Sequence, residues 1–194
     1  MTPNEYLEFE RQSKFKHEFF DGEIFVMAGG TPQHSLVRTN VVCELSTALK
    51  GYPCTTYDSD LRVLVEVTGL YTYPDASVFC DELQYEAGRN DVVVNPTLLV
   101  EVFSPSSEAY DRGKKFGHYR QIPSLREYVL VWQDEPRIES FHKNDQGAWE
   151  LTEAAGIDSK LPLASLGVDL SLREVFDKVV FEPVVTPPSP ASPV

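Results

Sequence analysis

The chain has 194 residues, of which 42% are hydrophobic and 24% charged, and this balance predicts one soluble globular domain with an ordinary core. Its 30 acidic residues outnumber 17 basic ones, so the net charge of −13 disfavours tight non-specific attraction to nucleic acid or to an anionic membrane. No apolar run approaches the roughly 18 residues of a membrane helix, and the N-terminus does not resemble a signal peptide, so we expect a cytoplasmic protein.

The cysteines, Cys43, Cys54 and Cys80, are odd in number and show no C-x-x-C spacing. This pattern indicates neither a disulfide framework nor a zinc ribbon. We therefore expect all of them to be reduced and mostly buried.

Two local signals organise the first residues of the chain. Thr2-Pro3-Asn4-Glu5 is a capping box, which predicts a short helix to about Gln12. Asp21-Gly22 lies between two apolar-rich runs and predicts a hairpin over 15–27 with a type I′ turn. Glu18 lies on that hairpin.

A longer helix is predicted from Thr31-Pro32 to Lys50, closed by Gly51. A packing stripe repeats every four residues along it, formed by Val37, Val41, Leu45 and Leu49. His34 falls in the first turn. A histidine there usually solvates the helix end, but it could also reach a neighbouring acidic site.

The segment from 52 to 80 is rich in β-forming residues. It predicts strands over 55–57, 61–67 and 76–80, with a Thr68-Gly69 turn between the second and the third. This meander delivers Asp75, which follows Pro74 at the mouth of a strand. The polar segment 81–95 is predicted to be a loop of a length that is often functional.

The run 98–103 is apolar except for Glu101, and such a run is typical of a strand buried on both faces. A buried, unpaired carboxylate costs several kcal/mol, so Glu101 needs a cation, a hydrogen-bond network or a raised pKa. The alternative is a half-exposed strand in which Glu101 forms a surface salt bridge.

The rest of the chain predicts one more helix over 108–121, stopped by Pro123, and a capping box at 171–174 that opens a short helix to about 179. Strands are predicted over 126–132, 137–142 and 149–153. The Pro- and Ser-rich tail 183–194 is predicted to be disordered, which leaves 1–182 as the domain.

Asp75 and Glu101 could share one hard cation, Mg²⁺ or Mn²⁺, if their strands lie side by side, because Mg²⁺ takes one or two protein carboxylates and keeps several waters. Aspartate after proline is also ordinary turn chemistry.

On the helix that follows, Asp111, Lys115 and Tyr119 are spaced by four and share one face. Lys115 is then carried inward toward the two acids, or it snorkels with its ammonium in water.

Four blocks of the sequence, in this order, closely resemble the Uma-two family of restriction-endonuclease-like proteins. They are YPDASV (73–78), PTLLVEVFSPS (96–106), YDRGKKF (110–116) and YRQIPSLREY (119–128). Glu18, Asp21-Gly22-Glu23 and His34 also look like the N-terminal pattern of that family. The family is similar to the PD-(D/E)XK nucleases, which implies an α/β fold with a central mixed sheet flanked by helices.

The resemblance assigns Asp75 as the first acid of a metal site and Glu101 as the second. Phe103 stands where the strict motif has lysine, so Lys115 on the next helix is the candidate for a migrated lysine. Glu18 would complete the metal shell or hold a water. His34 and Tyr119 are expected to support the residues of the site from outside it.

Together these residues predict a metal-dependent endonuclease that hydrolyses phosphodiester bonds of DNA. The bound metal would activate water, and Lys115 would stabilise charge in the transition state. A non-catalytic binding or assembly module on the same fold is the alternative, as is a nuclease acting on single strands or small phosphodiesters. The sequence has no Gly-rich phosphate loop, nucleophile elbow or H-E-x-x-H motif.

The net charge implies that DNA contacts are local, weak and assisted by the metal. The basic residues available beside the proposed site are Arg112, Lys114 and Arg120, followed by Arg126. Homo-oligomerisation is left open.

Overall fold

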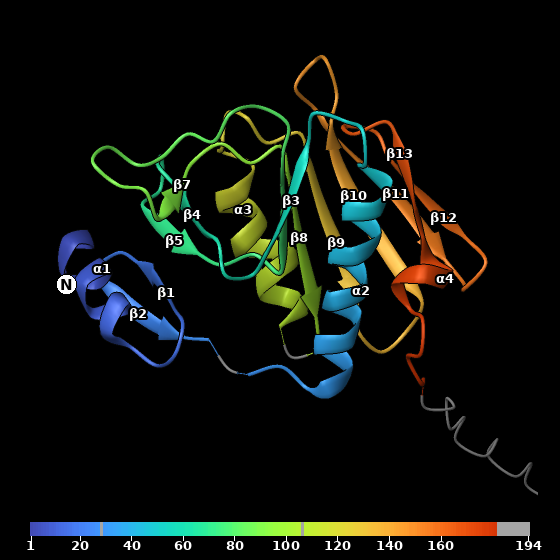
Figure 1. Cartoon of the computed structure of the whole chain (residues 1–194), viewed down its shortest axis with the longest axis horizontal. Helices are drawn as coiled ribbons and strands as arrows, with labels where there is room; N and C mark the ends of the chain where they lie inside the picture. The colour runs from blue at the N-terminus through green and yellow to red at the C-terminus, as the bar shows by residue number, and fades with distance from the viewer. Residues whose placement is uncertain (28, 106, 182–194) are drawn as a thin grey trace, which may run out of the picture.

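The structure is a computed structural model that describes residues 1–27, 29–105 and 107–181, and it is built from sheets with helices packed on their faces (Figure 1). A six-stranded sheet contains, in sheet order, β11 (Trp149–Ala155), β10 (Arg137–Lys143), β9 (Glu127–Trp132), β8 (Leu98–Phe103), β6 (Ala76–Phe79) and β3 (Thr55–Asp58). A five-stranded sheet contains β2 (Glu23–Val26), β1 (His17–Phe20), β5 (Leu70–Thr72), β4 (Arg62–Val65) and β7 (Val92–Val93). The two strands β12 (Lys160–Leu163) and β13 (Val168–Ser171) form a hairpin of their own.

Strand β8 lies inside the larger sheet, antiparallel to β6 and parallel to β9, so the sheet is mixed as predicted. All six of its residues are buried. The half-exposed alternative for this strand is therefore wrong. The predicted α/β fold, a central mixed sheet flanked by helices, is confirmed, although several individual elements differ from the prediction.

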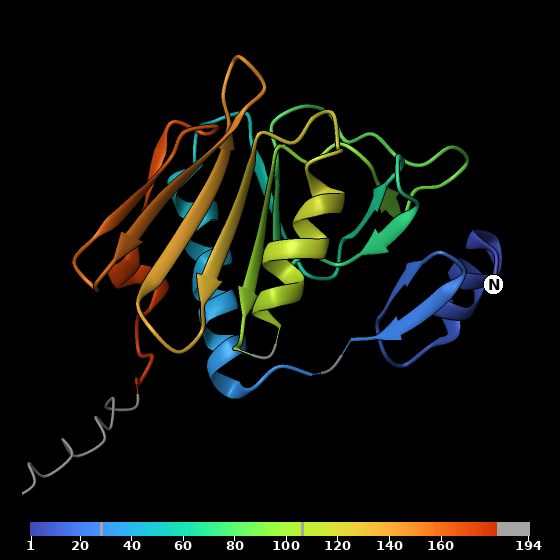
Figure 2. The ribbon, with the colours of Figure 1, turned by 180° about the vertical axis from the view of Figure 1, so that it is seen from behind.

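Helices cover opposite faces of this sheet (Figures 1 and 2). Helix α2 (Pro32–Ala48) lays its predicted stripe on one face, in one apolar cluster with Val100 and Val102 of β8. On the other face, Leu99 and Phe103 pack with residues of a second helical segment, made of the π-helix η1 (Tyr110–Lys115) and α3 (Phe116–Tyr119). Because side chains alternate along a strand, Glu101 is directed to the η1–α3 face.

The N-terminal predictions are confirmed. Helix α1 (Pro3–Gln12) has the complete capping box, with Thr2 and Glu5 bonded reciprocally. The hairpin turns at Asp21 and Gly22, whose φ angles of 48° and 82° are the positive values that a type I′ turn requires. Strand β1 then pairs with β5, and this pairing joins the hairpin to the rest of the chain.

Several elements differ from the prediction. The helix over 108–121 is π-helical at Tyr110–Lys115, and Ser171 makes no side-chain capping bond, so the second capping box is wrong and α4 covers only Leu172–Val175. Strands β5 and β7 were not predicted because they are three and two residues long, too short for an alternating pattern. The hairpin of β12 and β13 was also missed. Pro162 in β12 obscures its strand pattern, and proline is tolerated there because each strand of a two-stranded sheet is an edge.

The prediction of reduced cysteines is wrong for Cys54 and Cys80, which form a disulfide, and the prediction that the cysteines are mostly buried is wrong for all three. Thr55 pairs with Phe79 in the β3–β6 ladder, so the next step of the register places the two cysteines opposite each other. Both are half-buried, and Cys43 is free and exposed.

The predicted disordered tail, 183–194, lies outside the described residues. None of the described helices has the length and apolar character needed to cross a membrane.

Candidate active site

The carboxylate of Glu101 is buried and paired with a buried lysine. The Nζ atom of Lys115 lies 2.9 Å from Glu101 Oε1, and the Tyr119 hydroxyl donates a hydrogen bond of 2.7 Å to the same oxygen. Lys115 is only 4% exposed, so its ammonium does not snorkel into water. Glu101 thus has the cationic partner expected of a carboxylate in an apolar strand.

A second carboxylate reaches the same ammonium from the other sheet. Glu18 lies on β1, and its Oε1 atom is 3.1 Å from Lys115 Nζ. The Thr72 hydroxyl donates to Oε1 of Glu18 at 2.5 Å, and the Tyr110 hydroxyl donates to Oε2 at 3.1 Å. Lys115 therefore links the five-stranded sheet to the six-stranded sheet. Sequence reasoning missed Thr72, which lies on the unpredicted strand β5, and Tyr110.

The predicted polar face of the helical segment is present and buried. Asp111, Lys115 and Tyr119 are each no more than 5% exposed, and Asp111 Oδ1 lies 3.8 Å from Lys115 Nζ. Ile122 is buried in the apolar cluster of the same face. The segment thus supplies the site with one cation, one acid and one hydroxyl group.

Asp75 lies beside Glu101 at the start of β6. Ala76 pairs with Val100, so one further step of the antiparallel register sets Asp75 opposite Glu101. The Val102 backbone N–H donates a 2.8 Å hydrogen bond to Asp75 Oδ2.

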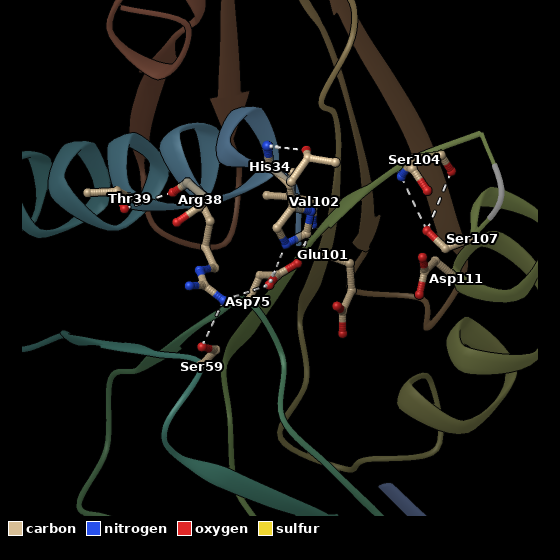
Figure 3. Close-up of polar contacts among 12 residues, drawn as sticks. His34, Arg38, Thr39, Ser59, Asp75, Glu101, Val102, Ser104, Ser107 and Asp111 are labelled. Carbon is tan, nitrogen blue, oxygen red and sulfur yellow. Dashed lines mark hydrogen bonds and ion pairs between the residues drawn. The ribbon is translucent and has the colours of Figure 1, made fainter. Parts of the chain in front are cut away.

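Two side chains of α2 are directed at Asp75 (Figure 3). His34 Nε2 lies 3.4 Å and Arg38 Nη1 lies 3.8 Å from Asp75 Oδ1. His34 therefore reaches the acidic site rather than only solvating the helix end. Arg38 was not predicted from the sequence, although it follows His34 by four residues and so lies on the same helix face.

The site carries more buried acids than cations, and their pKa values differ accordingly. Burial and, to a smaller extent, the charges of Asp75 and Asp111 raise the pKa of Glu101 to about 8, against the opposing attraction of Lys115. Burial also raises the pKa of Asp111. Burial alone would raise the pKa of Glu18, but the charge of Lys115 and the hydrogen bonds to its carboxylate leave it below the usual value.

Lys115 remains protonated in this environment. Burial alone would lower its pKa, but the charges of Glu101, Glu18 and Asp111 raise the pKa well above its usual value. One fixed positive charge is therefore held among three buried acids.

Among the described residues, no three His, Cys, Asp or Glu side chains are arranged as a metal-binding group. Two carboxylates with waters are nevertheless a common protein contribution to a Mg²⁺ site. Asp75 and Glu101 are two carboxylates near enough for the charge of Asp75 to raise the pKa of Glu101, although side chains of α2 contact Asp75 and side chains of η1–α3 contact Glu101. A divalent cation would relieve this repulsion, so the donor set fits a hard metal ion in its chemistry.

The basic residues predicted to contact DNA differ in their surroundings. Arg112 is paired with the buried carboxylate of Glu139 and lies over the Trp132 ring, 5.1 Å from its centre. Lys114 and Arg120 are exposed. Contact of these residues with DNA stays a prediction, and Arg112 would have to give up a carboxylate partner to make it.

The fold is the mixed α/β fold, with a central sheet flanked by helices, that is expected of a restriction-endonuclease-like protein. The model of the Uma2 family, described as "Putative restriction endonuclease", matches residues 3–173. The chain belongs to this family.

Similar proteins span nearly the whole chain. An uncharacterized protein of Synechocystis sp., slr1290, is 37% identical over 181 residues, which cover 93% of this chain and 94% of that protein. A second uncharacterized protein of the same organism, sll1609, is 33% identical over 168 residues, with coverage of 87% and 95%. A crystal structure from Anabaena variabilis, described as "a putative nuclease belonging to DUF820", aligns with a TM-score of 0.73 at 19% identity, covering 91% and 97%. At that identity the likeness shows the fold.

Proposed function

We propose that this protein is a metal-dependent endonuclease that hydrolyses phosphodiester bonds of DNA. The observation that carries the proposal is the buried ion pair of Lys115 with Glu101, next to Asp75 on the adjacent strand. Carboxyl groups whose pKa is strongly raised by burial, beside a specific charged partner, cluster at functional sites, and Glu101 is such a group. Membership of a family described as restriction endonucleases supports the same reaction class.

The residues have distinct roles in this proposal. Asp75 and Glu101 would hold Mg²⁺ or Mn²⁺, which when bound lowers the pKa of water and polarises a phosphate. Lys115 supplies a fixed positive charge for the transition state of phosphoryl transfer. Tyr119 fixes the Glu101 carboxylate through its hydroxyl, and Glu18 fixes the ammonium of Lys115 from the opposite side.

The remaining acid and the α2 residues surround this centre. Asp111 adds a third negative charge near Lys115 and keeps it protonated. His34 and Arg38 balance the charge of Asp75, so that the aspartate stays in place before a metal binds. A binding or assembly module on the same fold would have no catalytic use for these buried charges, so their presence favours the enzyme over that alternative.

The test is a cleavage assay on duplex DNA, single-stranded DNA and a small phosphodiester, each with Mg²⁺, Mn²⁺ or EDTA. Wild type is compared with Glu101→Gln and with Glu82→Gln, an exposed control away from the site. We expect cleavage of DNA that needs the metal and is lost in Glu101→Gln but kept in Glu82→Gln. If only the small diester is cleaved, the substrate is a small phosphodiester and not DNA. If no substrate is cleaved in a metal-dependent way, the result favours the non-catalytic module.

A further inference from the structure

The helical segment of the site contains a turn with one residue more than an α-helix has. The Phe116 backbone N–H donates to the Asp111 carbonyl, a bond that spans five residues instead of four. The segment returns to α-helical geometry at α3. Short π-helical turns inside α-helices are found frequently at functional sites, and this one lies in the segment that carries Lys115.

The extra residue decides which side chains share a face. Tyr110 and Lys115 are five residues apart, and both bind Glu18, through Oε2 and Oε1. In an α-helix with 3.6 residues per turn, five residues span about 1.4 turns, which would point the two side chains in different directions. In the π-helical turn the wider winding brings residues five apart much closer to one face, and both side chains reach the same carboxylate.

Tyr110 is the residue that this geometry adds to the site. It is 40% exposed, and its ring centre lies 6.0 Å from Lys115 Nζ, so the tyrosine lies between the buried ammonium and the protein surface. Its hydroxyl holds one Glu18 oxygen while Lys115 takes the other. Thr72 and Lys115 both bind Oε1 of Glu18, so the Tyr110 bond fixes the second oxygen, and its loss would loosen the orientation of the carboxylate that contacts the ammonium.

We propose that the π-helical turn Tyr110–Lys115 is a positioning element and that Tyr110 is a positioning residue that acts on Lys115 through Glu18. The consequence for catalysis rests on the proposed nuclease function. The contact itself does not, since it can be followed without any substrate.

Gly113 allows the turn itself to be tested. It lies within the turn, it is exposed, and a Cβ added there would meet no atom within 4 Å. Deleting Gly113 removes the extra residue, so the segment can close as a plain α-helix with Tyr110 rotated away from Glu18. Gly113→Ala keeps the chain length and serves as the matched control.

The experiment measures two quantities for each variant: kcat and KM for metal-dependent DNA cleavage, and the ¹³C resonance of the Glu18 carboxyl in the substrate-free protein. Tyr110→Phe is compared with Tyr52→Phe, an exposed control at the far end of α2. Tyr110→Phe should lower kcat roughly tenfold with little change in KM, the size expected for one hydrogen bond to a charged group, and should shift the Glu18 resonance. Deletion of Gly113 should do the same or more, and Gly113→Ala should do neither.

An unchanged Glu18 resonance in Tyr110→Phe and in the Gly113 deletion would overturn the proposal. So would a shifted resonance accompanied by an unchanged kcat in an active enzyme. If wild type cleaves nothing while the resonance shifts as expected, the proposed function fails and the positioning contact stands.

Discussion

Lys115 holds its ammonium 2.9 Å from a Glu101 carboxylate oxygen at a point where both side chains are almost fully buried, at 5% and 6% exposure. Glu101 comes from the middle strand of one sheet, and Glu18 meets the same ammonium from another. Breaking a buried charge network by removing one member is costly, because the remaining charges lose their partner.

Lys115→Met should lower DNA cleavage by about two or more orders of magnitude, the effect of losing a positioned charge in a buried site. It should also lower the free energy of unfolding by about 3 kcal/mol, because Glu18 and Glu101 are left without their cation. Steady-state cleavage and urea denaturation measure the two effects. Lys50→Met, at an exposed position, is the control and should change neither. Full cleavage by a folded Lys115→Met protein would contradict the assigned role.

Glu101→Gln should change how stability depends on pH. The pKa of Glu101 is raised by burial from 4.5 to about 8, so between these values the folded state binds more protons than the unfolded chain. Wild type should therefore lose stability relative to Glu101→Gln as the pH rises through this window, by up to about 1.4 kcal/mol per pH unit. Urea denaturation of both proteins from pH 5 to 9 measures the difference, and parallel pH profiles would show that the carboxyl titrates normally.

Reduction of the Cys54–Cys80 disulfide should destabilise the fold. The bond closes a loop with a sequence separation of 26 residues, and the loss of its constraint on the unfolded chain is worth about 3.5 kcal/mol. The free energy of unfolding should fall by that order in dithiothreitol or in a Cys54→Ser, Cys80→Ser double variant. Cys43→Ser, at the free exposed cysteine, is the control. An unfolding curve that is the same with and without reductant would show that the bridge does not form.

Lys114 and Arg120 should each contribute to DNA binding, while Arg112 should matter more for stability. In anisotropy titrations with Mg²⁺, using Lys115→Met protein so that the DNA stays intact, Lys114→Gln and Arg120→Gln should weaken binding. Each should also reduce the slope of log K against log salt by about 0.9 for a lost phosphate contact. Arg173→Gln, exposed and distant from the site, is the control. Tight binding in EDTA with a steep salt slope would show that a different surface binds DNA.

The sequence was sufficient for the parts of the fold that follow from local patterns. The run around Glu101 was correctly predicted as a buried strand, because six residues with one polar member leave few other structures open. The stripe of α2 and the Asp21-Gly22 turn follow in the same way from helical spacing and from the residues that tolerate positive φ.

What the sequence could not supply depends on contacts between distant segments. Thr72 reaches Glu18 only because β1 pairs with β5, a three-residue strand with no pattern of its own. The Cys54–Cys80 bridge depends on the register of β3 against β6, which no cysteine spacing reveals. The spacing by four of Asp111, Lys115 and Tyr119 indicated one face, but the π-helical turn that adds Tyr110 has no sequence signal that we can name.

Calorimetric titration of Mn²⁺ into the protein at pH 8 measures whether Asp75 and Glu101 hold a divalent metal ion. Wild type, Asp75→Asn and Glu101→Gln are compared with Asp145→Asn, an exposed aspartate in the turn before β11. We expect one Mn²⁺ site in wild type and in Asp145→Asn, and at least about tenfold weaker binding in each of the other two variants, because each has lost one of the two proposed protein ligands. Wild type without a Mn²⁺ site, or Asp75→Asn and Glu101→Gln proteins that bind Mn²⁺ as wild type does, would contradict the proposed metal site.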